Sequence, residues 1–264
     1  MRDALRLYFR YLGISVRAQL QYPGSFAMQA AGQLLVTVIE IVGIVALFDR
    51  FGTLRGWTLP QVALLYGVTD ITFAIADALA RGFSVFSTMV RSGDFDRILL
   101  RPRSTILQIL GQEITLRRGG RLVQGAAVLG WAAAQGAVAW TPASVAILAA
   151  AVVGGACLFM GLFILQATSA FWTVETLEVW NTVTHGGNYA SQYPMTIYRR
   201  WFRGFFTWVV PLALVSFVPS AAVLGRADAS PLAAGLAPLA GVAFLLASLG
   251  VWRLGVRRYT STGS

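Results

Sequence analysis

The sequence is poor in the residues on which soluble enzymes and metal sites depend. It contains no lysine, one cysteine, one histidine and 12% charged residues, about half the share of an ordinary soluble domain. A single cysteine excludes a disulfide scaffold, and one cysteine with one histidine excludes a zinc site, which takes several such ligands. A catalytic pair of Cys157 and His185 is disfavoured, because Cys157 lies inside an apolar run, where cysteines are usually inert.

The missing lysine also bears on ATP hydrolysis. A P-loop of the form GxxxxGK[ST] uses its lysine on the nucleotide phosphates, and this chain cannot carry that motif. We therefore expect no catalytic residue, no metal site and no cofactor in this chain.

Apolar residues are abundant instead. They make up 56% of the chain, and its mean hydropathy is +0.66. Apolar runs of about 18 or more residues are typical of membrane-spanning helices, and six runs qualify: 26–48, 59–81, 122–140, 143–171, 205–224 and 231–252. Pro211 and Pro219 interrupt the fifth run. The sequence therefore predicts an all-α polytopic membrane protein with six transmembrane helices.

The arginines predict the orientation, because cytoplasmic loops of membrane proteins concentrate positive charge. All 21 basic residues are arginine, and the net charge is +10. With the N-terminus inside, three arginines fall in outer loops, namely Arg50, Arg55 and Arg226. The other eighteen fall in inner segments and include Arg121, Arg199, Arg200 and Arg203. We expect both termini in the cytoplasm. Charges at span ends, rather than on one soluble face, argue against nucleic acid as a partner.

The segment before the first span, residues 1–24, has apolar residues every three or four positions and arginines on another face. This pattern predicts an amphipathic helix. Such a helix either lies in the inner lipid interface or packs on protein, and arginine next to a span favours the interface, with membrane lipids as partners.

The longest inner segment, 82–121, contains a short run that predicts a helix from Asp94 to Pro102. Asp94 or Asp96 can cap its start, Leu99 and Leu100 provide an apolar side, and Pro102 ends it. Such a helix either docks into another protein or belongs to a solvated loop, and the residue pattern leaves both interpretations open.

Three carboxylates lie within predicted spans, where ionisable groups are costly and often functional. Asp77 precedes Arg81 by four residues, the favourable order for a helix ion pair. Antiparallel packing of the first two spans brings Glu40 and Asp70 to similar depths. Glu40, Asp70 and Asp77 are therefore candidates for the translocation path, as a polar lining or a proton-linked site. Alternatively, they bond hydroxyls, amides or groups of a partner chain.

The run from Gly93 to Pro102 resembles a signature of ABC-2-type transporter permeases, in particular of a short six-span bacterial subfamily. The pattern is G-x-x-D-x-x-L-L-x-P, matched by Gly93, Asp96, Leu99, Leu100 and Pro102. Later residues, Tyr193–Tyr198 and Pro211–Pro219, resemble that subfamily's YP..IY and P.A...(Y/F).P motifs. The resemblance extends over essentially the whole chain.

The resemblance implies that residues 1–264 form one ABC-2-type transmembrane domain, the permease of an ATP-driven exporter. It would move an amphipathic or hydrophobic solute outward across the bacterial inner membrane. Two permease chains, identical or paralogous, would form a dimer on separate ATP-binding subunits that hold ATP and Mg. Residues 1–24 would be an interfacial elbow helix. The ATPase-coupling residues would be Gly93, Asp94, Phe95, Asp96, Arg97, Leu99, Leu100, Arg101 and Pro102.

A proton-coupled secondary transporter using Glu40, Asp70 and Asp77 is the alternative. Such folds usually contain internal repeats, and the first three spans show no similarity to the last three. The sequence does not place the depth of the polar, aromatic-rich segment 173–192, in which His185 is expected to be a loop residue.

Overall fold

The structure is a computed structural model that describes residues 23–111, 119–136, 138–173, 178–226 and 231–260. Some side chains in the first half of the first helix fall outside this description. The predicted N-terminal helix over 1–24 lies almost wholly outside the described residues.

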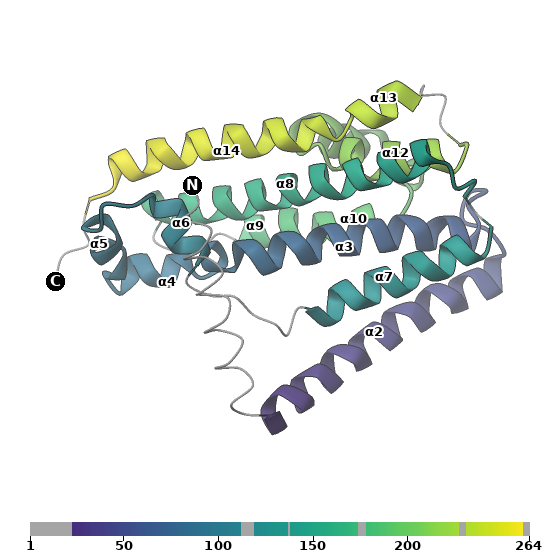
Figure 1. The fold of residues 1–264 in the computed structure, drawn as a ribbon, viewed down its shortest axis with the longest axis horizontal. Coiled ribbons are helices and arrows are strands. Elements are labelled where there is room, and N and C mark those ends of the chain that lie inside the picture. The colour runs from purple at the N-terminus through teal and green to yellow at the C-terminus, as the bar shows by residue number, and fades with distance from the viewer. Residues whose placement is uncertain (1–22, 112–118, 137, 174–177, 227–230, 261–264) are drawn as a thin grey trace.

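The described residues form helices and no strand, apart from one isolated bridge between Leu54 and Trp57. Among the described residues, five long helices make up the bundle, and α2 is inclined to the others (Figure 1). They are α2 (Pro23–Phe51), α3 (Leu59–Ser84), α7 (Gly119–Ala134), α8 (Pro142–Thr173) and α14 (Leu239–Arg258). The prediction of an all-α protein is confirmed.

Short helices gather at one end of this bundle, next to the end of α14 (Figure 1). They are α4 (Phe86–Arg91), α5 (Asp94–Leu99) and α6 (Thr105–Leu110). We call this the α5 end. The opposite end carries the α2–α3 connection, residues 52–58, and is called the loop end.

Local chemistry explains where two of the long helices begin. At α8, the Thr141 hydroxyl accepts from the Ser144 backbone N–H at 3.1 Å, and the Ser144 hydroxyl accepts from the Thr141 N–H at 2.8 Å. This reciprocal pair satisfies two donors that a helix start leaves free. At α3, the Gln61 side chain accepts from the Thr58 N–H at 3.1 Å.

Among the residues that the structure describes, three helical stretches are long and apolar enough to cross a membrane: 59–91, 142–173 and 231–258. The first joins α3 with α4, the second is α8, and the third joins α13 (Pro231–Leu236) with α14. Helix α7 is shorter, with 16 described residues. Helices α2 and α7 are not among these three stretches, so their predicted crossings stay predictions from the sequence.

The expected fifth span over 205–224 is not one straight helix. Its first limb, 200–209, consists of α11 (Arg200–Gly204) and the π-helical η4 (Phe205–Val209). Its second limb, 213–223, consists of the π-helical η5 (Ala213–Phe217) and α12 (Val218–Val223). The limbs meet at a bend of 85°. Pro211 lies at the bend, where its missing N–H interrupts the helical hydrogen bonds.

The first limb begins at the loop end, and the second limb ends there. Just before the first limb, Thr196 accepts hydrogen bonds from Arg55 at 3.0 Å and from the Trp57 indole at 3.2 Å. Just after the second limb, the Arg226 guanidinium donates to the carbonyl oxygen of Gly56 at 2.5 Å. A segment that begins and ends at the same end of the bundle is re-entrant. The contacts therefore favour a re-entrant pair over a fifth crossing at 205–224.

The described part of the segment 173–192, whose depth the sequence did not place, runs between the two ends of the bundle instead. At its start, Phe171 packs on Phe95 at the α5 end, with ring centroids 5.5 Å apart. Beyond it, Tyr193 packs in a cluster with Trp57 at the loop end. Between them lie α9 (Glu178–Asn181), η2 (Thr182–Gly186) and α10 (Gly187–Ser191). His185 belongs to the π-helical η2, so its prediction as a loop residue was wrong.

Residues 178–192 therefore bring the chain to the loop end before Arg199, Arg200 and Arg203. The three arginines follow Thr196 closely, so they lie towards the loop end together with Arg55 and Arg226. The sequence placed them on the opposite side, with the α5 segment. The arginine contrast between the two ends is therefore smaller than predicted.

Candidate functional site

The predicted coupling segment forms helix α5 at the α5 end. Gly93 precedes the helix with a φ of 74°, a conformation that glycine adopts without steric cost. No side chain caps the helix, so the prediction that Asp94 or Asp96 would do so was wrong. The Ser92 hydroxyl instead donates to the Asp94 carboxylate at 2.7 Å, which lowers the pKa of Asp94. The helix ends at Leu99, ahead of Pro102.

One face of α5 is buried and the other is exposed. Phe95 is 0% exposed and Ile98 3%, whereas Leu99 is 40% exposed and Leu100 85%. The resemblance included Phe95 among the ATPase-coupling residues without marking it as buried, and it did not include Ile98. Their i, i+3 spacing is the signal that could have identified them as the inward face.

Phe95 attaches α5 to three other elements. Its ring centroid lies 4.9 Å from Phe86 of α4, 5.5 Å from Phe171 of α8 and 5.0 Å from Tyr259, just after α14. Trp252 of α14 packs against Phe86 and Phe171 in the same cluster. These close-packed rings therefore join α5 directly to the ends of α8 and α14.

A second candidate site lies inside the bundle. It consists of Glu40, Tyr66, Asp70, Arg121 and Gln124, which we call the polar cluster. Arg121 Nε donates to Asp70 Oδ1 at 2.7 Å, with the Asp70 side chain fully buried. The guanidinium also lies over the ring of Phe73, 4.8 Å from its centroid. A buried carboxylate requires such a partner.

Arg121 was missed as the partner of Asp70. The sequence assigned it to the segment before the third span, but α7 begins at Gly119 and carries Arg121 within its first turn. No local pattern connects these two residues, which lie 51 positions apart.

Glu40 belongs to the same cluster through Tyr66. The Tyr66 hydroxyl donates to Glu40 Oε2 at 2.9 Å, and the Gln124 amide donates to the Tyr66 oxygen at 2.5 Å. Tyr66 and Asp70 are one helical turn apart on α3, so the structure brings Glu40 and Asp70 together around this turn. Asp77 is buried further along α3.

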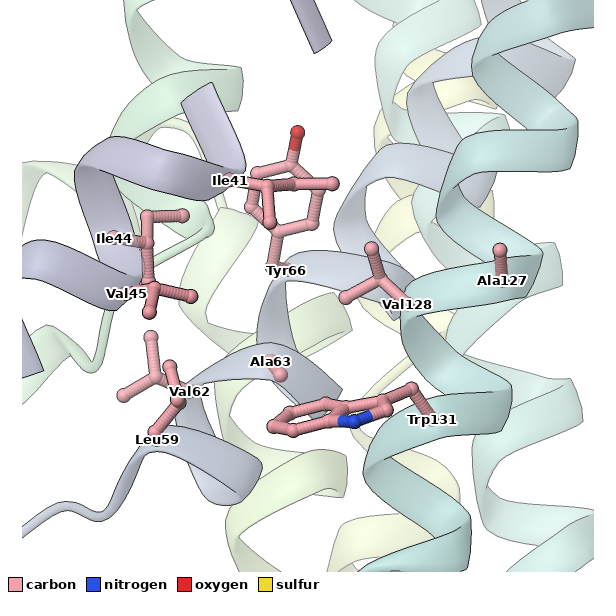
Figure 2. A pocket seen from close by; sticks show the side chains of 10 residues that line it. All are labelled: Ile41, Ile44, Val45, Leu59, Val62, Ala63, Tyr66, Ala127, Val128 and Trp131. Atoms are coloured by element: carbon pink, nitrogen blue, oxygen red, sulfur yellow. The ribbon is translucent and has the colours of Figure 1, made fainter. Parts of the chain in front are cut away.

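An apolar cavity of about 410 Å³ adjoins the polar cluster. Three helices line it: α2 with Ile41, Ile44 and Val45, α3 with Leu59, Val62, Ala63 and Tyr66, and α7 with Ala127, Val128 and Trp131. In Figure 2 the Tyr66 hydroxyl lies at one end of the lining and Trp131 at the other. Its volume is within the range of small-molecule sites.

Within the described part of the chain, no three His, Cys, Asp or Glu side chains lie close enough to hold a metal ion.

Comparison with protein families finds a match to the family described as ABC-2 family transporter protein, over residues 34–263. Neither a search of curated proteins nor a search of solved structures finds a match. The matched range includes α5, the polar cluster and the apolar cavity.

Proposed function

Because the chain belongs to the ABC-2 transporter family, we propose that it is the membrane-spanning permease subunit of an ATP-driven exporter. The exporter moves an amphipathic or hydrophobic solute outward across the bacterial inner membrane. Members of this family generally partner with ATP-binding subunits. The permease breaks no covalent bond, and ATP and Mg bind the partner subunits, in keeping with the absence of lysine here.

The two faces of α5 carry this proposal. Leu99 and Leu100 are exposed at the tip of the bundle and available to a groove on an ATP-binding subunit, while Phe95 fixes the helix to α8 and α14. When two such subunits close on ATP, α5 follows them, and the attached helices change their arrangement. A dimer of permease chains then converts between two states, and transport requires different affinities for the solute in those states.

In the proposed topology, six crossings place both termini and α5 on the cytoplasmic side. The crossings are α2, α3, α7, α8, residues 178–192 and α13 with α14, and the pair 200–223 re-enters from the outer side. The loop end is therefore the outer end.

The alternative, a proton-coupled transporter using Glu40, Asp70 and Asp77, has less support. Arg121 neutralises Asp70 by a direct ion pair. A carboxylate that is already paired with an arginine is a poor site for binding a transported proton. Transport that continues without ATP and stops when the proton gradient is removed would favour this alternative.

The test is co-purification of the chain with a candidate ATP-binding subunit, followed by measurement of ATPase activity. Leu100→Asp places a charge at the exposed C-terminal end of α5, and we expect loss of the complex with unchanged thermal stability of the permease alone. Thr53→Asp adds the same charge at an exposed position of the loop end and should retain the complex. If Leu100→Asp retains both complex and ATPase activity, α5 is not the docking element.

A further inference from the structure

We propose that the apolar cavity between α2, α3 and α7 binds a single-chain amphiphile with a cationic headgroup. The alkyl chain lies along the apolar walls, and the headgroup lies beside Glu40 in the polar cluster.

The walls of the cavity suit an alkyl chain. Nine of the ten lining residues have hydrocarbon or indole side chains, and the tenth, Tyr66, carries its one polar atom at the end near Glu40. From Leu59 to Tyr66 the α3 wall covers eight residues, whose seven steps of helical rise span roughly 10 Å. An apolar space with carboxylates and a hydroxyl at one end, and only the Trp131 indole N–H at the other, matches an amphiphile rather than a compact polar solute.

The charge of the polar cluster selects a cation. Glu40 and Asp70 contribute two carboxylates, and Arg121 contributes one guanidinium, which is paired with Asp70. Among the described residues, Glu40 accepts a hydrogen bond from the neutral Tyr66 hydroxyl and forms no ion pair. An unmatched carboxylate among apolar helices is unfavourable. A cationic headgroup beside Glu40 compensates that charge.

The cavity is accessible from the side of the bundle. Val45 of α2 is 46% exposed and Trp131 of α7 is 43% exposed, whereas Val62, Ala63 and Tyr66 on the α3 wall are buried. The opening therefore lies between α2 and α7, on a surface that faces the bilayer if these helices span it. An amphiphile already partitioned into the membrane enters there directly.

The identification of this amphiphile as the exported solute rests on the proposed function. The binding of the amphiphile to the cavity does not depend on that function. The experiment uses the full chain alone, in nanodiscs of an uncharged glycosyl diacylglycerol, so that no lipid ammonium group competes for Glu40. Radiolabelled dodecyltrimethylammonium is the probe, and retention by empty nanodiscs is subtracted. We expect saturable binding, with at least tenfold weaker binding of the anionic dodecyl sulfate at submicellar concentration.

Two variants locate the site, each with a matched control. Glu40→Gln removes the charge but keeps an acceptor for Tyr66, and it should weaken dodecyltrimethylammonium binding about tenfold, or about 1.4 kcal/mol. Asp49→Asn removes a carboxylate from the exposed end of α2 and should bind like wild type. Val128→Trp fills the cavity and should abolish saturable binding. Val123→Trp adds the same ring at an exposed position of α7 outside the cavity and should not.

Equal binding of the two probes by the wild-type chain would overturn the proposal, and that comparison requires no variant to fold. Binding that is indifferent to both Glu40→Gln and Val128→Trp would overturn it as well. Because no ATP-binding subunit is present, failure here leaves the α5 docking test unaffected, and failure of α5 docking leaves amphiphile binding unaffected.

Discussion

At the scale of single residues, the polar cluster shows how a membrane protein accommodates charge inside a helix bundle. Asp70 is fully buried, and Arg121 reaches it at 2.7 Å while lying over the ring of Phe73. The direct hydrogen bond and the ring face together replace water around the guanidinium. The pair fixes α7 against α3 at this depth.

We predict that Arg121→Gln destabilises the protein by about 3 kcal/mol, because it leaves the Asp70 carboxylate buried without its partner. The double variant with Asp70→Asn should recover most of this loss, since two neutral amides then replace two charges. Thermal unfolding in detergent measures both effects. A double variant as unstable as Arg121→Gln would show that the ion pair is not the source of the loss.

At the scale of helices, the close approach of α14 to α8 depends on glycine, which has no side chain. A Cβ at Gly241 of α14 would collide with the carbonyl oxygen of Gly154 on α8. Small residues allow backbones to approach in this way, and van der Waals packing then drives helix association in lipid. The α8–α14 pair is also the pair to which the aromatic cluster attaches α5. Its packing therefore supports the proposed coupling.

We predict that Gly241→Ala destabilises the protein by about 1–3 kcal/mol, because the added methyl group forces α14 away from α8. Gly250→Ala on the same helix is the control. A Cβ there meets no atom within 4 Å, and alanine is the better helix former, so stability should stay equal or rise by up to about 1 kcal/mol. Thermal unfolding again gives the comparison, and equal losses for the two variants would contradict the predicted close contact.

At the scale of the whole molecule, the structure changes which segments cross the bundle. Residues 178–192 lead from the α5 end to the loop end, and residues 200–223 begin and end at the loop end. The proposed number of crossings is still six, but the fifth crossing comes before Arg199 rather than after Arg203.

Labelling of single cysteines tests this topology. In a Cys157→Ser background, we predict that Thr53→Cys and Arg200→Cys react with a membrane-impermeant maleimide from the same side of the membrane. Leu100→Cys should react from the opposite side. All three positions are exposed, so accessibility within the protein does not limit the reaction. Labelling of Arg200→Cys from the same side as Leu100→Cys would contradict the proposed topology and support the one expected from the sequence.

The sequence by itself determined the helical class and the transporter family. Long apolar runs form helices because a membrane helix satisfies its own backbone hydrogen bonds, and the residues from Gly93 to Pro102 resemble an ABC-2 pattern that the family match confirms. The position of α5 was also predictable from local residues, since Gly93 and Pro102 limit where a helix between them can begin and end.

Only the tertiary structure decided how distant segments meet. It paired Asp70 with Arg121, connected Glu40 with Gln124 through Tyr66, and enclosed the apolar cavity between three helices. It also bent 200–223 by 85° into two limbs that begin and end at the loop end, although the two limbs together are apolar enough for a span. Hydropathy reports how much apolar surface a segment carries, but not which helix covers it or at which end it begins. Those choices depend on packing and on charge pairing between residues far apart in the chain.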